Sequence, residues 1–141
     1  MLIKIYNSKE IENRFLILME KLDENEKMTI INSIFHIKDN YNWKPVPPIA
    51  KPLHNTWDEE LFEFRISLSK ILIRINYFID YEINCIVLLN WYEKPNWSKD
   101  KNSYNKTKKK QLDQLIKQSI EIALVLKKEY NINNNNYELL N

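Results

Sequence analysis

The sequence predicts a single α+β domain, in which a small antiparallel sheet carries a helical hairpin and a C-terminal helix. Residues 60–94 alternate in polarity with the period of two that is typical of strands. Residues 11–41 and 107–130 instead repeat apolar side chains every three or four positions, as amphipathic helices do. The chain has 141 residues, which suits one domain with a sizeable core.

Three strands are expected in a row, over Glu60–Ser67, Ile71–Asp80 and Asn84–Lys94. The second is the clearest, because isoleucines at alternate positions are separated by side chains that include Arg74. The third contains residues 85–89, a run that is apolar on both faces, as in a central covered strand. Short connections between the three predict an antiparallel meander. Its polar side chains are few, and function is expected among them first.

A strand and two helices are expected before the meander. Residues 2–6 alternate like a short strand, and Ser8 is suited to cap the first helix. Asp23 and Glu26 form a capping box that begins a second helix, which extends to about Tyr41. Two helices joined so tightly predict an antiparallel hairpin.

The remaining segments complete the order β-α-α-β-β-β-α. Residues 42–57 hold four of the five prolines and are expected to be irregular. A third helix is expected over residues 107–130, which would end a single domain of residues 1–130. Residues 131–141 are rich in asparagine and predict a flexible tail. Because glycine is absent, tight turns such as residues 80–84 must place Asn or Asp at any positive φ.

Composition excludes several function classes. A glycine-rich phosphate loop is impossible without glycine, and two isolated histidines, His36 and His54, predict neither a metal site nor a cofactor. The single Cys85 is compatible with a reducing compartment. Residues 1–7 are too short and polar for a signal peptide, and no apolar run is long enough to span a bilayer. We therefore expect a soluble, cytoplasmic protein.

Arginine is informative in this lysine-rich chain. Of the 21 Lys and Arg residues, the arginines are Arg14, Arg65 and Arg74, and two of these lie in the meander. The planar guanidinium can grip a phosphate or carboxylate with two hydrogen bonds, which lysine cannot do. The sequence leaves two interpretations open: an anion-binding site, or a cross-strand pair with Glu63 or Asp80.

A set of lysines, Lys99, Lys101, Lys106, Lys108, Lys109 and Lys110, forms a second candidate feature, and we call its last four members the basic run. Lysines crowd the start of the third expected helix, where the helix dipole disfavours cations and an anionic ligand would offset the cost. Nearby aromatic side chains, Tyr92 and Tyr104 among them, can stack on bases, although Tyr92 also suits the core. The alternative is a solvated lysine-rich surface. The candidate RNA-binding residues are Lys51, His54, Tyr104, Lys106, Lys108, Lys109 and Lys110.

Four segments, in order, resemble a known family of toxins. Residues 61–66, Leu-Phe-Glu-Phe-Arg-Ile, are similar to the "L-[WY]-E-L-R" strand of RelE/HigB-type toxins of the RelE/ParE superfamily, in particular their phage-derived branch. Residues 74–79 resemble the following "R-[IV]-x-Y-F" strand, and residues 86–94 resemble the "I-V-L-L-x-x-F-x-K" strand. Residues 15–27 are similar to the helical hairpin of the family. The resemblance covers roughly residues 1–130.

The resemblance implies the toxin of a type II toxin–antitoxin system, an endoribonuclease that cuts messenger RNA on the ribosome. In this family the 2′-hydroxyl attacks the adjacent phosphate, and basic residues stabilise the developing charge. By strand position Arg74 matches the catalytic arginine of the family. Arg65 matches the arginine of the first strand, and Lys94 falls where the last strand supplies another basic residue. The implied partners are the ribosome, messenger RNA and a cognate helix-turn-helix antitoxin.

The sequence also departs from the family pattern. Leu61 and Glu63 stand where some members carry lysines, and the basic run that usually follows the last strand is replaced after Lys94. A second function therefore stays open: a non-catalytic binding protein on the same fold. Such a protein would be a gyrase-type poison, or a degenerate toxin that only contacts its antitoxin or RNA.

Overall fold

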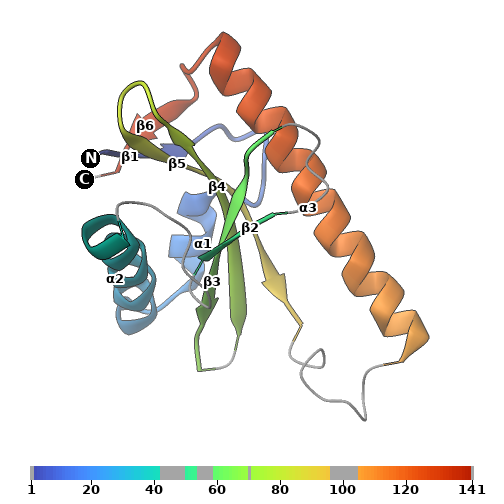
Figure 1. The fold of residues 1–141 in the computed structure, drawn as a ribbon. Coiled ribbons are helices and arrows are strands. Elements are labelled where there is room, and N and C mark those ends of the chain that lie inside the picture. Colours follow the sequence, from blue (N-terminus) through green and yellow to red (C-terminus); the bar gives the residue numbers. More distant parts are fainter. Residues whose placement is uncertain (1, 42–49, 54–58, 70, 96–104, 141) are drawn as a thin grey trace.

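The computed structural model describes residues 2–41, 50–53, 59–69, 71–95 and 105–140. Within them the chain forms one mixed sheet and three helices, which confirms the α+β class (Figure 1). The strands are β1 (Leu2–Tyr6), β2 (Ala50–Pro52), β3 (Phe62–Ser67), β4 (Leu72–Asp80), β5 (Cys85–Lys94) and β6 (Tyr137–Leu139). The helices are α1 (Phe15–Lys21), α2 (Glu24–Tyr41) and α3 (Lys106–Ile132).

The sheet has the strand order β2-β3-β4-β5-β1-β6. The antiparallel meander is confirmed, because β3 pairs with β4 and β4 pairs with β5 in antiparallel register. The expectation of an all-antiparallel sheet is wrong, since β1 lies parallel to β5. No tight turn joins β1 to β5: the chain leaves β1 through the helices and reaches the far edge of the sheet first. The direction of β1 is therefore not set by a hairpin.

Two short edge strands were not expected. Residues 42–57 were predicted to be irregular, yet β2 pairs with β3; residues 42–49 and 54–58 lie outside the described part of the chain. Pro52 is compatible with β2 because β2 is an edge strand. The C-terminal segment, expected as a flexible tail, contains β6, which pairs with β1.

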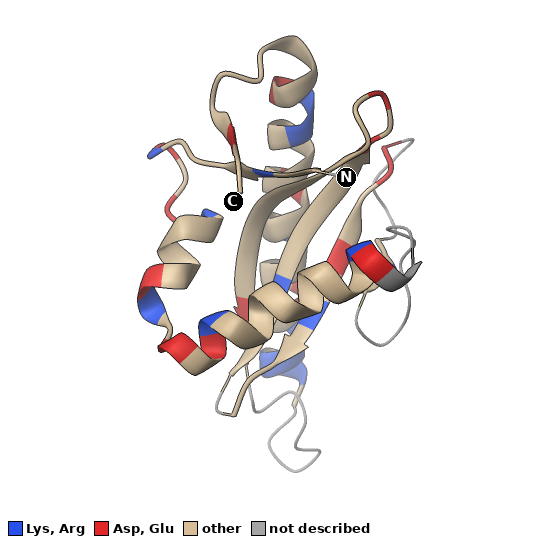
Figure 2. Cartoon of the chain, turned by 90° about the vertical axis from the view of Figure 1, so that its left-hand side faces the viewer, with Lys and Arg blue, Asp and Glu red and all other residues tan. Residues whose placement is uncertain are grey.

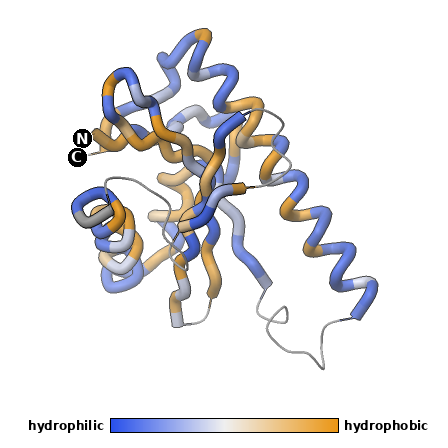
Figure 3. Tube along the Cα trace, in the orientation of Figure 1, coloured by the Kyte–Doolittle hydropathy of each residue, from blue (hydrophilic) through white to orange (hydrophobic). Residues whose placement is uncertain are grey.

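The helices cover both faces of the sheet. Figure 1 shows α1 and α2 on one side of the strands and α3 on the other. The period of two in β4 explains this arrangement, because Ile73 and Ile75 face the α1–α2 layer while Phe78 faces α3. Figure 3 shows apolar segments concentrated in the strands, whereas α3 is mostly hydrophilic with apolar segments interspersed along it. Each face of the sheet therefore contributes to its own apolar layer.

The first helix starts later than expected. Ser8 was predicted to cap it, but α1 begins at Phe15. Arg14, the residue just before α1, is extended and forms an isolated bridge with Asn90 of β5, and the Trp91 N–H donates to the Asn13 carbonyl at 3.1 Å. This pairing with a distant strand prevents the helix from starting earlier.

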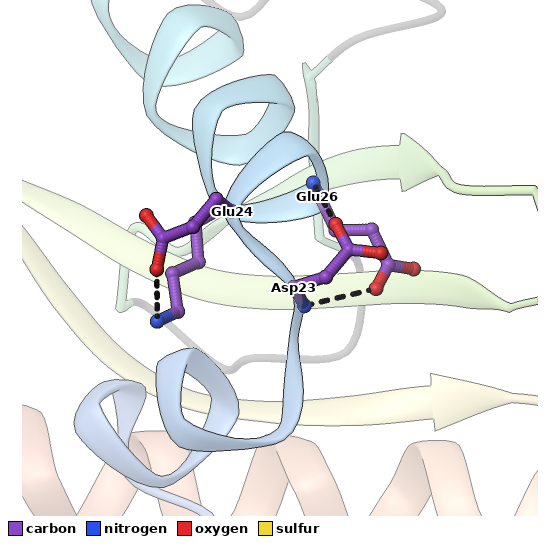
Figure 4. Close-up of polar contacts among 4 residues, drawn as sticks. Asp23, Glu24 and Glu26 are labelled. Atoms are coloured by element: carbon purple, nitrogen blue, oxygen red, sulfur yellow. Dashed lines mark hydrogen bonds and ion pairs between the residues drawn. The ribbon is translucent and has the colours of Figure 1, made fainter.

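The start of α2 confirms the predicted capping box. The Glu26 N–H donates to Asp23 Oδ1 at 2.8 Å, and the Asp23 N–H donates to Glu26 Oε1 at 3.2 Å (Figure 4). Both hydrogen bonds satisfy backbone donors that have no partner within the helix. They mark the start of α2 at Glu24, shortly after α1 ends at Lys21.

The β4–β5 turn shows how a chain without glycine makes a tight connection. Asn84 adopts φ 53°, in the left-handed region. Asparagine tolerates this conformation better than most residues. The expectation that Asn or Asp would take such positions is confirmed here.

Among the described helices, none is long and apolar enough to cross a membrane.

Buried tyrosines predict a loss of stability in alkali. Burial is the main cause that raises the pKa above 10.0 for five of them: Tyr6, Tyr77, Tyr92, Tyr130 and Tyr137. A raised pKa in the folded state means that folding favours the protonated phenol. This stabilisation is complete below pH 10 and is lost as the pH rises through the folded-state values.

We therefore expect the free energy of unfolding to fall above about pH 10. The measurement is absorbance of tyrosinate at alkaline pH, recorded with circular dichroism of the backbone. Tyrosinate of these residues should appear together with unfolding. Titration of all tyrosines near pH 10 in a chain that stays folded would contradict the expectation.

Candidate active site on the sheet face under α3

Two arginines lie directly opposite each other on neighbouring strands. In the β3–β4 register Arg65 is the partner of Arg74, and in the β4–β5 register Arg74 is the partner of Tyr92. Directly opposed residues point to the same face of a sheet. Arg65, Arg74 and Tyr92 thus form one row across three strands. Asn76, two residues after Arg74 on the same face, contacts α3, so this row lies on the α3 face.

Adjacent rows on this face add two lysines and one glutamate. Glu63 is the register partner of Lys51 on β2 and of Asn76 on β4. Lys94 is the partner of Leu72, two residues before Arg74. We call Lys51, Arg65, Arg74 and Lys94 the cationic cluster. The three residues predicted to be catalytic therefore share one face, and the sheet register adds Lys51 to them.

The innermost residue of the cluster is Arg74, which pairs with Glu63. The Arg74 Nε–Glu63 Oε1 distance is 3.8 Å, and the two side chains are 7% and 5% exposed. The Tyr92 hydroxyl donates to Glu63 Oε2 at 3.4 Å, and Arg74 Nη1 donates to the Ile73 carbonyl at 3.1 Å. Of the two pairings left open by the sequence, the structure forms the one with Glu63. Asp80 instead accepts a hydrogen bond from Tyr130 at 2.7 Å.

The charges of the cluster act on one another. Burial lowers the pKa of Arg74, and the nearby Arg65 lowers it further, while Glu63 opposes the change. Burial is also the main cause that lowers the pKa of Lys94, and the positive charges of Arg74 and Arg65 lower it further. Burial and then Glu63 raise the pKa of the Tyr92 phenol.

The Arg65–Arg74 pair breaks a rule of sheet stability. Like charges directly across two strands are destabilising. Within the described part of this face, the four cations of the cluster lie in the row of Glu63 or in the next two rows, and Glu63 is the carboxylate among them. An uncompensated positive charge of this kind favours binding of an anion and is typical of functional sites.

A buried polar network positions α3 beside the cluster. Asn76 Nδ2 donates to Ser119 Oγ at 2.8 Å, and Asn90 Nδ2 donates to the Ser119 carbonyl at 3.0 Å. Asn76 Nδ2 also donates to Asn90 Oδ1 at 3.2 Å. Asn76 follows Arg74 by two residues on the same face, so the network fixes where α3 crosses the sheet.

The basic run occupies another element. Lys106, Lys108, Lys109 and Lys110 lie in the first turns of α3, where Asn105 caps the helix by accepting from the Lys108 N–H at 3.0 Å. Figure 1 shows this end of α3 extending away from the strands, and Figure 2 shows basic segments both there and on the strands. The structure thus separates the run from the cationic cluster. His54 and Tyr104 lie outside the described residues.

The sequence did not identify Glu63 and Tyr92 as parts of the site. The sequence indicates Glu63 only as a partner of Arg74, and Tyr92 only as a base-stacking or core residue. The structure joins them through the hydrogen bond between their side chains. The period of two places Glu63 on the face of Arg65, but the role of Tyr92 depends on the cross-strand register.

The described residues contain no cluster of His, Cys, Asp and Glu suited to a metal ion.

Comparisons with protein-family models, with curated proteins and with solved structures found no match to this chain. The likeness to RelE/HigB-type toxins therefore depends on the sequence motifs and their order.

Proposed function

We propose that the chain is the toxin of a type II toxin–antitoxin system and cleaves messenger RNA on the ribosome at the cationic cluster. The observation that carries the proposal is the direct opposition of Arg65 and Arg74, with Lys94 and Lys51 on the same face. Guanidinium groups grip phosphates with two hydrogen bonds. A phosphate would relieve the repulsion that the two arginines impose on each other.

The proposed reaction needs charge stabilisation and proton transfer. The 2′-hydroxyl gives up its proton as its oxygen attacks phosphorus and forms a 2′-O–P bond, while the bond from phosphorus to the 5′-oxygen breaks and the 5′-oxygen accepts a proton. The products are a 2′,3′-cyclic phosphate and a 5′-hydroxyl. Arg65 and Arg74 stabilise the charge that develops on the phosphate oxygens. The lowered pKa of Lys94 makes it the member of the cluster best suited to exchange a proton.

The decisive experiment is cleavage of messenger RNA by the purified protein in the presence and absence of ribosomes. Mapping of RNA 5′ ends after induced expression would locate the cuts in cells. We expect ribosome-dependent cuts that leave 5′-hydroxyl ends. Intact RNA, together with normal growth of the expressing cells, would contradict the proposed activity. We expect the antitoxin to be a helix-turn-helix protein encoded by the gene next to that of this chain.

The basic run is proposed to bind the RNA or ribosome outside the reaction centre. Changing Lys108, Lys109 and Lys110 to glutamine should weaken binding and flatten its dependence on salt. For each phosphate that the variant no longer binds, the slope of log affinity against log salt should fall by up to about 0.9. The measurement is a salt titration of ribosome or RNA binding.

A matched control removes the same charge elsewhere. Lys9, Lys38 and Lys128 lie in other parts of the chain, and their replacement by glutamine should leave the salt slope close to that of the wild type. An unchanged slope after replacement of the basic run would assign that run to the solvated surface.

A non-catalytic binding protein is the second candidate. The deep burial of the Arg74–Glu63 pair favours it, because a buried ion pair also serves as a structural element. In this case the protein would bind RNA, gyrase or its antitoxin without cutting RNA. The cleavage assay separates the two functions directly.

A further inference from the structure

Glu63 is an unexpected residue to find beside the cationic cluster, because it is negatively charged. A carboxylate repels phosphate, yet Glu63 lies in the row beside Arg65 and Arg74 and approaches the innermost cation. Its contacts are long. The 3.8 Å separation from Arg74 exceeds hydrogen-bond length, and the 3.4 Å contact with Tyr92 is longer than a good O–H···O bond. The carboxylate is near its partners without being tightly bound to them.

Exposure differs between the members of the cluster. Lys51, Arg65 and Lys94 are half-buried, so each keeps contact with solvent. Arg74 and Glu63 are buried. An anion from solvent would thus meet the outer cations first. Arg74 would become available to it when Glu63 moves away.

The charges also favour an exchange. Glu63 supplies one negative charge to the four cations of the cluster, so the described part of the cluster keeps a net positive charge. A phosphate diester supplies the same charge and presents two oxygens in the geometry that a guanidinium fork matches. It can also contact Arg65 or Lys94 at the same time.

We propose that Glu63 is an internal counter-ion that occupies Arg74 in the free protein and is displaced when a phosphate group binds. The site is then self-inhibited, and phosphate binding is coupled to release of the Arg74–Glu63 pair. This inference rests on the part of the proposed function in which the cluster binds phosphate. It does not depend on whether RNA is cut.

The test substitutes Glu63→Gln, which keeps the shape and the acceptor for Tyr92 but removes the charge. In chloride, the variant should have a lower Tm than the wild type, because Arg74 loses its buried counter-ion. Addition of inorganic phosphate at constant ionic strength should raise the Tm of the variant at least about twice as much as that of the wild type. The dissociation constant of phosphate should fall at least about tenfold, since a competing charge at contact distance is removed.

Glu93→Gln is the matched control. Glu93 is an exposed glutamate next to Tyr92 on β5, and its register partner Ile73 points to the opposite face of the sheet. The substitution changes the net charge equally and should leave the phosphate response unchanged. An equal response of both variants would overturn the proposal, because it would reflect net charge rather than position.

The double variant Glu63→Gln/Arg74→Gln should lose the enhanced phosphate response. Retention of this response in the double variant would overturn the proposal. If Glu63→Gln unfolds in chloride, recovery of the fold on addition of phosphate supports the proposal, and failure to recover overturns it. RNA cleavage is measured separately: phosphate binding without cleavage would reject the proposed nuclease and leave the counter-ion role intact.

Discussion

Replacement of Arg74 by lysine is expected to lower RNA cleavage at least about tenfold, equivalent to about 1.4 kcal/mol of transition-state stabilisation. Lysine keeps the positive charge that Glu63 requires across the strands. It loses the planar fork that can bind two phosphate oxygens at once. The variant should thus remain folded while its chemistry is impaired. The measurement is cleavage on purified ribosomes, recorded beside the melting temperature.

Arg14→Lys is the matched control for this substitution. Arg14 is the remaining arginine of the chain, and its Nη1 donates to the Ile11 carbonyl at 3.0 Å, outside the cationic cluster. Its replacement should leave the cleavage rate close to that of the wild type. A melting temperature of Arg74→Lys that falls in step with activity would instead assign Arg74 to the scaffold.

The meander could be predicted from sequence because its signal is local. The period of two in β4 and short turns determine both the strands and their antiparallel pairing. The parallel pairing of β1 with β5 depends on contacts between distant segments, which no local pattern encodes. The strands β2 and β6 have three residues each, too few for periodicity to be recognised.

The candidate site was predictable to a similar degree. Alternation places Arg65 and Arg74 on one face once the register is known, and the register follows from the short connection between β3 and β4. The involvement of Lys51 requires β2, which was not expected. The burial of Arg74 and Glu63 depends on tertiary packing that the alternation of a single strand does not reveal.

The second large effect is expected at Asn90, a fully buried residue of β5. Asn90→Leu should lower the free energy of unfolding by about 3 kcal/mol. The substitution removes the donor group that contacts Ser119 and the acceptor at 3.2 Å from Asn76 Nδ2, and leucine can replace neither. Chemical denaturation measures the loss, and hydrogen exchange should show weaker protection in the middle of α3.

Gln118→Leu provides the control, because Gln118 is the exposed neighbour of Ser119 on α3. Its effect on stability should stay within about 0.5 kcal/mol. The triple variant Asn76→Leu/Asn90→Leu/Ser119→Ala replaces every side chain of the network by apolar groups. It should be no less stable than Asn90→Leu alone, since no half-satisfied polar side chain remains. Costs that simply add across the three positions would show that the contacts act independently rather than as a network.

Because Asn76 lies two residues along β4 from Arg74, the same variants test how α3 affects the cationic cluster. Asn90→Leu should weaken binding of ribosomes or RNA in addition to stability, since α3 carries the basic run and the network sets its position on the sheet. The comparison is made at a temperature where both proteins are fully folded. Unchanged binding by the folded variant would mean that the basic run acts independently of where α3 crosses the sheet.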